Sequence, residues 1–220
     1  MTRAHLKITM NSKQEAKQRI EKLRHEVNHH RYLYHVLDKP VISDAALDSL
    51  KHELWQLEQE FPDLITSDSP TQRVGGRALA EFKKVKHVRP ILSIEDAFSF
   101  EEIQSWEERN ERFIKEKIRG YYCEPKMDGL AIMLRYDDGI LTAGVTRGDG
   151  DMGEDVTAAI RTIESIPLRL AGHSYPATLW VRGEVVIAKI EFKRINAAIQ
   201  NTGGKEFANP RNLAAGTIRQ

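Results

Sequence analysis

The chain has 220 residues, 40% of them hydrophobic and 30% charged, a composition typical of an ordinary soluble globular protein. Its formal net charge of +1 excludes a protein that binds nucleic acid through bulk positive charge, so any such contact must be local. A single cysteine, Cys123, excludes an internal disulfide framework, and no run approaches the length of a membrane span. We therefore expect a soluble intracellular protein.

Two stretches near the N-terminus carry apolar residues at helical spacing. The first starts at Ser12 and the second after Ser43, with Pro62 as the stop of the second. Two amphipathic helices joined by a short loop form a helical hairpin, which is too small to fold stably alone. The pattern therefore predicts a helical cap over residues 1–70, docked on a larger domain over residues 71–220.

The larger domain mixes helices and strands. Its first part, up to residue 98, is expected to be irregular, and Ser99 with Glu102 forms a capping-box pattern that opens a helix through about Lys117. Turn residues and periodicity then predict a β-hairpin with strands at 130–136 and 140–146, a helix at 155–163 and a strand at 179–188. Two further helices are expected at 189–200 and 210–220. The expected fold class is α+β, a helical hairpin cap on a mixed α/β domain.

One segment, Glu124-Pro125-Lys126-Met127-Asp128-Gly129, points to chemistry. Lys126 has a carboxylate two residues before it and another two residues after it, so in extended backbone all three charges would share one face. A lysine amine attacks only when deprotonated, and carboxylates favour its protonated form, so a nucleophilic Lys126 would need other cations or a metal nearby. The second half of the chain offers Arg147, Arg182, Arg211 and Arg219. The spacing alone fits a surface Glu–Lys–Asp ion network equally well.

Family resemblance favours the reactive lysine. The segment resembles the Lys-x-Asp-Gly motif of covalent nucleotidyltransferases, which include DNA ligases, RNA ligases and mRNA capping enzymes. Longer blocks look like the bacterial NAD-dependent DNA ligases: Thr146-Arg147-Gly148-Asp149-Gly150 with Gly153-Glu154-Asp155-Val156-Thr157, Val181-Arg182-Gly183-Glu184-Val185, and Phe207-Ala208-Asn209-Pro210-Arg211-Asn212. Tyr34-His35-Val36-Leu37-Asp38, followed by Ser43-Asp44 and Asp48, resembles that family's N-terminal helical module. The resemblance runs from about residue 15 to the last residue.

The resemblance implies an ATP-grasp-like ligase adenylation domain in which Lys126 attacks the α-phosphate of NAD. It implies that Glu124 recognises adenine in a pocket lined by Ser93 and Ile94, and that Arg147 and Glu184 hold the nucleotide. Asp128 would have a supporting or metal-related role. Arg211 and Arg219, two turns apart on one predicted helix, could present guanidinium groups to phosphates.

The helical module would bind the nicotinamide mononucleotide half of NAD. An aromatic ring can stack on nicotinamide, and carboxylates can complement its positive charge. The residues expected there are Tyr34, His35, Asp44, Ala45, Ala46, Leu47 and Asp48. Leu47 departs from the family, which commonly has a tyrosine at that position, so part of this contact is expected to differ.

The resemblance also implies cofactors, partners and a location. Mg²⁺, with Mn²⁺ as a substitute, would accompany the substrate, and no metal site made of protein groups alone is expected. The partner of the full-length protein would be nicked double-stranded DNA, during replication and repair. The protein would be a monomer, located in the bacterial cytoplasm at the nucleoid. Zinc would belong only to family segments that have no counterpart here, so we expect this chain to be a fragment, poorly active in nick sealing alone.

Weaker signals have simpler interpretations. His25 and His29 lie four residues apart, but no matching carboxylate or thiol supports a metal site. Cys123 is expected to be a small core residue rather than a nucleophile. Lys83, Lys84 and Lys86 form either a solvated face or a DNA contact, with the solvated face favoured.

Two other functions stay open at this point. An ATP-dependent nucleotidyltransferase of the RNA ligase or capping type would share the lysine motif, although residues 12–61 argue against it. A non-catalytic module that binds NAD or nicotinamide mononucleotide would keep the lysine without using it.

Overall fold

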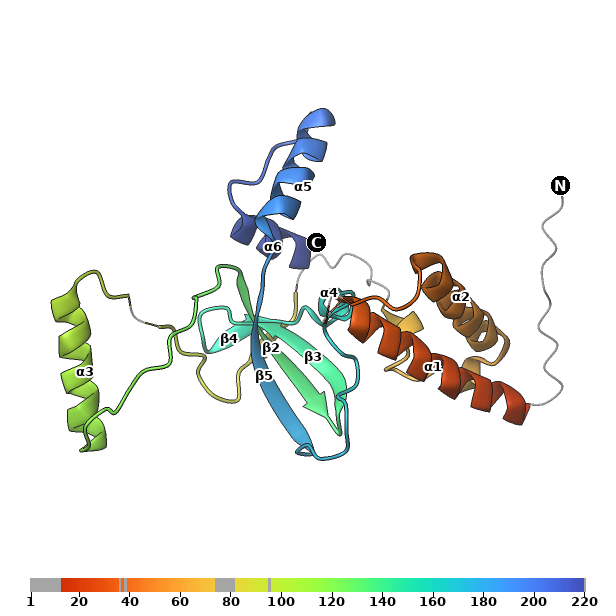
Figure 1. The fold of residues 1–220 in the computed structure, drawn as a ribbon, viewed down its shortest axis with the longest axis horizontal. Helices are drawn as coiled ribbons and strands as arrows, with labels where there is room; N and C mark the ends of the chain where they lie inside the picture. Colours follow the sequence, from red (N-terminus) through yellow and green to blue (C-terminus); the bar gives the residue numbers. More distant parts are fainter. Residues whose placement is uncertain (1–12, 36, 38, 74–81, 95, 220) are drawn as a thin grey trace.

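In this computed structural model, the part of the chain that the structure describes comprises residues 13–35, 37, 39–73, 82–94 and 96–219. It contains helices α1–α6, strands β1–β5 and two short 3-10 turns, η1 and η2. The fold is mixed α+β, with the helical hairpin beside the strands (Figure 1).

A three-stranded antiparallel sheet in the order β3-β2-β5 forms the centre of the domain. Its strands are β2 (Leu130–Asp137), β3 (Ile140–Thr146) and β5 (Thr178–Val185). The predicted hairpin between β2 and β3 is confirmed. Its turn residues Asp138 and Gly139 have φ values of 47° and 77°, a conformation that favours this residue pair.

The structure contains a second, two-stranded sheet that was not predicted from the sequence. Strand β1 (Lys84–Lys86) pairs antiparallel with β4 (Met152–Glu154), with Lys84 directly opposite Glu154. Each strand has three residues, too few to show an alternating pattern. The expectation of an irregular segment up to residue 98 was therefore wrong at β1.

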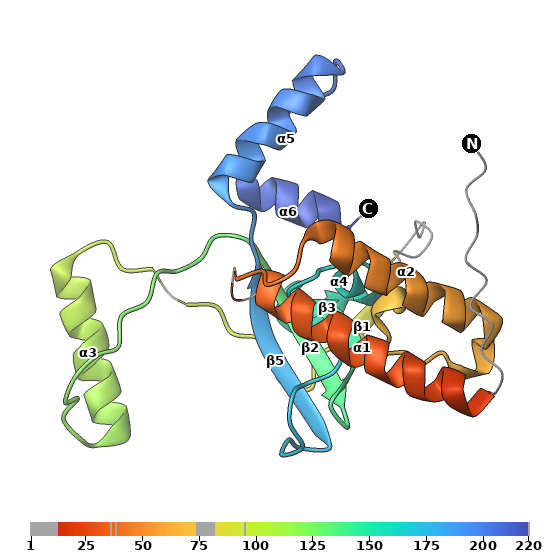
Figure 2. The same ribbon diagram turned by 45° about the vertical axis from the view of Figure 1, so that its right-hand side comes forward.

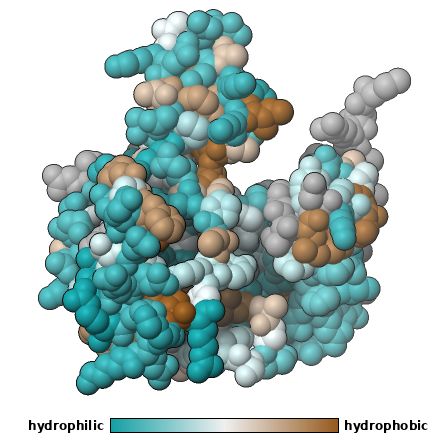
Figure 3. All heavy atoms as spheres, turned by 60° about the vertical axis from the view of Figure 1, so that its left-hand side comes forward, coloured by the Kyte–Doolittle hydropathy of each residue, from teal (hydrophilic) through white to brown (hydrophobic). Residues whose placement is uncertain are grey.

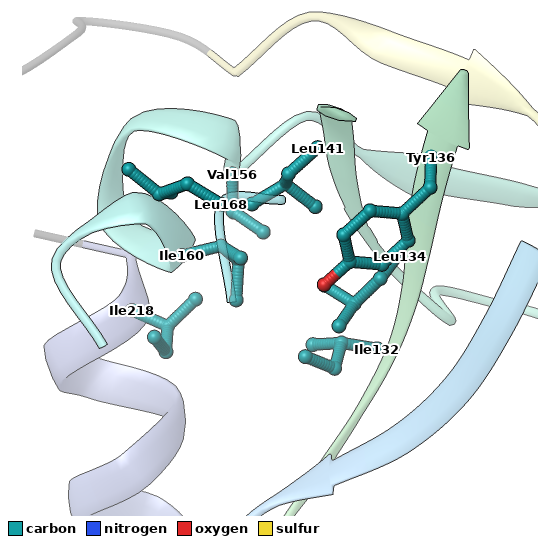
Figure 4. Close-up of a cluster of buried hydrophobic side chains, with 8 residues drawn as sticks. All are labelled: Ile132, Leu134, Tyr136, Leu141, Val156, Ile160, Leu168 and Ile218. Carbon is teal, nitrogen blue, oxygen red and sulfur yellow. The ribbon is translucent and has the colours of Figure 1, made fainter. Parts of the chain in front are cut away.

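The hydrophobic core lies on one face of the central sheet. Alternate residues of β2, namely Ile132, Leu134 and Tyr136, point into it and are at most 8% exposed. Helix α4 (Thr157–Arg161) covers this face through Ile160, as Figure 4 shows. The remaining members of the cluster are Leu141, Val156, Leu168 and Ile218. Burying each such aliphatic side chain contributes about 1.5–3 kcal/mol.

The helical hairpin has a core of its own. Helices α1 (Lys13–His35) and α2 (Asp44–Glu60) bury Ile20, Leu23, Leu54 and Leu57 between them. Ser43 caps α2 by accepting a hydrogen bond from the backbone N–H of Ala46. Both helices start within one or two residues of the positions that the sequence predicted.

A buried carboxylate and its arginine partner tie the hairpin to the turns that follow it: Arg24 donates to the carbonyl of Leu64 in η1 (Pro62–Leu64), and the carboxylate reaches η2 (Pro70–Gln72). Glu58 is 1% exposed and accepts hydrogen bonds from Arg24, Ser69 and Thr71. A buried charge is tolerated only when it is paired and hydrogen-bonded, and Glu58 meets both conditions.

The helical hairpin lies beside the central sheet (Figure 2), and arginine side chains connect the two. Arg31 of α1 forms an ion pair with Glu164, and Arg169 pairs with Asp68 at 2.5 Å. Arg73 donates hydrogen bonds of 2.8–3.3 Å to the carbonyl oxygens of Arg161, Ile163 and Ile166. Burial lowers the pKa of Arg31 and of Arg73 to about 10. These contacts confirm that the hairpin docks on the remainder of the chain.

Helix α3 (Phe100–Ile114) stands away from the sheet and has no buried residue (Figure 1). Ser99 caps the helix by accepting from the N–H of Glu102, and the Glu102 side chain accepts from the N–H of Phe98, one residue before the position that a capping box uses. The helix ends before the predicted Lys117, because Lys115 adopts a left-handed conformation with a φ of 59°.

The last two helices are α5 (Lys189–Asn201) and α6 (Pro210–Ile218), as the sequence predicted. Asn209 caps α6 by accepting from the N–H of Asn212, and Ile218 anchors the helix to the core. None of the helices in the described part of the chain is long and apolar enough to cross a membrane.

We predict that Arg73→Met lowers the free energy of unfolding by about 2 kcal/mol, because three carbonyl groups lose a charged donor. Urea unfolding of the full chain measures this loss. Arg194→Met is the matched control, since Arg194 is an exposed arginine that pairs only with Glu191 on the same helix, and it should change stability by less than about 0.5 kcal/mol. Equal effects of the two substitutions would contradict a fastening role for Arg73.

Candidate active site

Lys126 lies in an irregular segment that leads directly into β2. Gly129 of this segment is buried, and a Cβ atom there would lie 2.2 Å from the carbonyl oxygen of Val185 in β5. Only glycine permits so close an approach of two backbones. The glycine of the Lys-x-Asp-Gly motif thus holds the lysine segment against the end of β5, while the Lys126 side chain stays exposed.

A cavity of about 860 Å³ opens beside this segment, within the size range of small-molecule sites. It lies across the sheet from the core, because Ala131, Arg182 and Glu184 alternate with the core-facing residues of β2 and β5. Residues from seven parts of the chain line it: Lys84, Ser93 and Ile94, 126–131, 146–149, Met152 and Glu154, 182–184, and Arg211, Ala215 and Arg219. In the view with the α3 side forward, hydrophilic residues dominate the surface (Figure 3).

Two arginines hold the segment around Ser93 against the cavity. Arg147 donates to the Ser93 hydroxyl at 3.3 Å, and Arg182 donates to the carbonyl oxygen of Leu92 at 3.0 Å. The carbonyl of Arg147 lies 3.0 Å from Nε2 of His87, a side chain that is 7% exposed. The sequence blocks around residues 93 and 147 therefore meet in space.

The two arginines of the last helix reach the same cavity, each beside a carboxylate. Arg211 lies 3.4 Å from Asp128 of the lysine segment, and Arg219 pairs with Glu154 of β4 at 3.0 Å. Arg219 is the C-cap of α6 rather than a residue within it. The helix thus spans the cavity from the lysine segment to the small sheet.

Cationic side chains outnumber acidic ones around the cavity. The cations are Lys84, Lys126, Arg147, Arg182, Arg211 and Arg219, and the acids are Asp128, Asp149, Glu154 and Glu184. Such an excess favours an anionic ligand. The Asp149 carboxylate stabilises its own loop by accepting hydrogen bonds from the backbone N–H groups of Met152 and Asp151. These bonds lower the pKa of its carboxyl.

Comparison with known proteins gives the family. Residues 79–220 match the family described as NAD-dependent DNA ligase adenylation domain, and residues 13–75 match the one described as DNA ligase-like, N-terminal NAD+-binding domain. The chain belongs to the NAD-dependent DNA ligase family.

Individual relatives agree with this assignment. The chain is 49% identical over 214 residues to a DNA ligase of Pseudomonas entomophila, with 93% of this chain and 27% of the relative covered. It is 50% identical over 212 residues to a DNA ligase of Geotalea uraniireducens, with 94% of this chain and 31% of the relative covered. The chain therefore spans less than a third of the length of these DNA ligases.

The structure brings together most of the residues that the sequence analysis assigned to the adenylate, from the family resemblance or, for Arg211 and Arg219, from helical spacing. Eight of them line the cavity: Ser93, Ile94, Lys126, Asp128, Arg147, Glu184, Arg211 and Arg219. Glu124 is exposed and is not among the lining residues. Lys84 and Glu154 line the cavity without having been assigned a role, and Arg182 lines it after having been named only as a cation in the second half of the chain. Arg182 and Glu154 lay inside the motif blocks, whereas Lys84 had been interpreted as a solvated residue.

The residues assigned to nicotinamide form a separate group, at the end of α1 and the start of α2. Tyr34, Asp44, Ala45 and Asp48 are exposed there, and none of the six whose side chains the structure describes lines the cavity. Leu47 is 6% exposed, so its side chain packs inside the module. The side chain of His35 lies outside the described residues.

Two further expectations concern metals and Cys123. In the described ranges, no three His, Cys, Asp or Glu side chains gather in a way that could hold a metal ion. Cys123 is exposed, so its expected core position was wrong. The reason is that the segment before β2 runs outside the sheet.

We predict that Gly129→Ala lowers the rate of adenylate formation at least about tenfold, because the new methyl group would clash with Val185 and displace Lys126. Intact-mass spectrometry after incubation with NAD measures the adduct. Gly120→Ala is the control, since a Cβ at Gly120 meets nothing within 4 Å. An unchanged rate in Gly129→Ala would show that this close approach does not place the lysine.

Proposed function

We propose that this chain reacts with NAD to form a covalent adenylate on Lys126. The amine of Lys126 attacks the phosphorus of the adenylate half of NAD, forming a P–N bond. The bond from that phosphorus to the bridging oxygen breaks, and nicotinamide mononucleotide leaves with the bonding electrons. The amine loses one proton in the process. The products are a phosphoramidate-linked AMP on the chain and free nicotinamide mononucleotide.

The observation that carries this proposal is that Lys126 opens onto the same cation-rich cavity as Arg147 and Glu184. A carboxylate such as Glu184 accepts hydrogen bonds from ribose hydroxyl groups, and guanidinium groups bind phosphate oxygens. The side chains of Ser93 and Ile94 would lie against adenine, with Glu124 as a further contact. Arg211 and Arg219 would face the phosphates.

The helical module supports NAD as the adenylate donor. Its match to an NAD+-binding domain suggests that Tyr34, Asp44 and Asp48 hold the nicotinamide half, together with the other residues at that turn. We place the division between module and adenylation domain at about residue 70. The module would add affinity through a part of NAD that does not react, which lowers the barrier by holding the reacting phosphate in place.

A divalent cation fits this cavity only in partnership with the substrate. Asp128 and Glu184 are carboxylates on its lining, but the cavity also holds six cationic side chains. We propose that Mg²⁺ or Mn²⁺ binds mainly through phosphate oxygens and offsets their charge.

The adenylate would be passed to DNA by the longer protein. We propose that a chain with the extent of its relatives transfers AMP to the 5′-phosphate at a nick, after which the 3′-hydroxyl displaces AMP and seals the strand. It would act as a monomer inside a bacterial cell.

We predict that Lys126→Ala abolishes the adduct formed with NAD, because no other group replaces the attacking amine. Intact-mass spectrometry followed by peptide mapping detects the adduct and locates it. Lys205→Ala is the control, since Lys205 is exposed and does not line the cavity, and it should label as the unsubstituted chain does. A persistent adduct in Lys126→Ala, or labelling by ATP in preference to NAD, would overturn the proposal.

We predict that Asp48→Asn lowers kcat/KM for adenylation by NAD about tenfold, because an exposed carboxylate no longer complements the positive nicotinamide ring. Binding of AMP alone should stay the same, because AMP lacks nicotinamide. Glu60→Gln, at the other end of α2, is the control and should leave both kcat/KM for NAD and the binding of AMP unchanged. Loss of AMP binding in Asp48→Asn would contradict a role confined to nicotinamide.

A further inference from the structure

Glu154 is held more firmly than the cations around it. Its side chain is 16% exposed, and its backbone N–H donates to the Thr146 hydroxyl at 3.0 Å. The residue before it, Gly153, approaches β3 so closely that a Cβ would lie 1.9 Å from the carbonyl oxygen of Thr146. Strand pairing with β1 fixes it from the other side. The Glu154 carboxylate therefore has a defined position on the cavity wall.

The two cations that it binds are long side chains with much of their surface in solvent. Lys84 is 64% exposed and donates to Oε1 at 2.9 Å. Arg219 is 54% exposed and binds in a two-point fork, with Nε 3.0 Å from Oε2 and a terminal nitrogen 3.0 Å from Oε1. Such a fork fixes the plane of a guanidinium, whereas an arginine in solvent samples many rotamers.

The carboxylate also joins parts of the chain that are far apart in the sequence. Lys84 comes from β1, Glu154 from β4, and Arg219 from the end of α6. The Lys84 and Arg219 bonds to Glu154 hold the carboxyl pKa below its ordinary value, so the group is charged at neutral pH. Three groups that line the cavity thus form one ionic cluster.

We propose that Glu154 is a positioning residue that orients Arg219, with Lys84 beside it, so that Arg219 binds the phosphate of the nucleotide. This inference rests on the proposed function, because it assigns a role to Glu154 and Lys84 at the same site. Glu154 does not touch the phosphate; it acts through Arg219.

Two roles for the Glu154 carboxylate predict opposite changes in the affinity of the cavity for a phosphate when its charge is removed. If its carboxylate only cancelled positive charge, removing that charge would make the cavity more cationic and would tighten the binding of an anion. If it positions Arg219, removing the charge releases the guanidinium into solvent and weakens the binding of a phosphate. The sign of the change therefore separates the two roles.

The test compares AMP with adenosine in the full chain by isothermal titration. Glu154→Gln keeps the shape of the side chain and removes its charge. We expect the Kd for AMP to rise about five- to tenfold, the loss of about one charge-assisted hydrogen bond, and the Kd for adenosine to stay within about twofold. In an Arg219→Ala background the same substitution should have no further effect on AMP, because the two residues act together.

Glu191→Gln is the matched control. Glu191 also pairs with an arginine, Arg194, but on α5 and away from the cavity, so this change should affect neither ligand. Thermal unfolding of each variant shows whether the fold is kept.

Several outcomes would overturn the inference. They are tighter or unchanged AMP binding in Glu154→Gln, an equal loss for AMP and adenosine, and additive effects with Arg219→Ala. Equal affinity of the unsubstituted chain for AMP and adenosine would also overturn the inference, because the phosphate would then contribute nothing to binding. AMP has no leaving group and cannot label Lys126, so these results do not depend on whether NAD forms the covalent adduct.

Discussion

Strand β2 pairs with β3 on one side and with β5 on the other, and the alternation of its side chains divides the domain into two environments. Ile132, Leu134 and Tyr136 enter the core, while the residues between them face away from it. A shift of one residue in this register would exchange the two sets. The cavity exists only because the register with β5 brings Ala131 beside Glu184, next to the segment that carries Lys126.

Features that depend on local physics were predicted well from the sequence. The helix starts after Ser43, Ser99 and residue 209 were predicted, and at each start a side chain accepts one short-range hydrogen bond from the first turn. The β2–β3 hairpin follows from an Asp-Gly pair between alternating strands.

Features that depend on long-range contacts were not predictable in the same way. Strand β1 has three residues, and only its pairing with β4 makes it a strand. Lys84 was interpreted as solvated because its sequence neighbours are lysines, while Glu154 lies 70 residues away. The residues of the candidate site were named from a family resemblance, and no spacing rule would have joined Ser93 to Arg147. The residues expected to contact nicotinamide had already been assigned to the helical module from the sequence, and in the structure Tyr34, Asp44 and Asp48 lie apart from the cavity beside Lys126.

That separation bears on how one donor would be distinguished from another. Under the proposed function, the cavity beside Lys126 would contact adenine, ribose and phosphate, which NAD and ATP have in common, so it would not by itself favour NAD. The residues suited to nicotinamide lie on the helical module, whose position relative to the sheet domain is set by polar contacts of Arg31, Arg73 and Arg169. Arginine contacts with carbonyl and carboxylate groups require defined geometry, whereas an apolar interface can slide. Selection of NAD would therefore depend on residues such as Arg73, which touch neither part of the substrate but fix the surface on which nicotinamide is recognised.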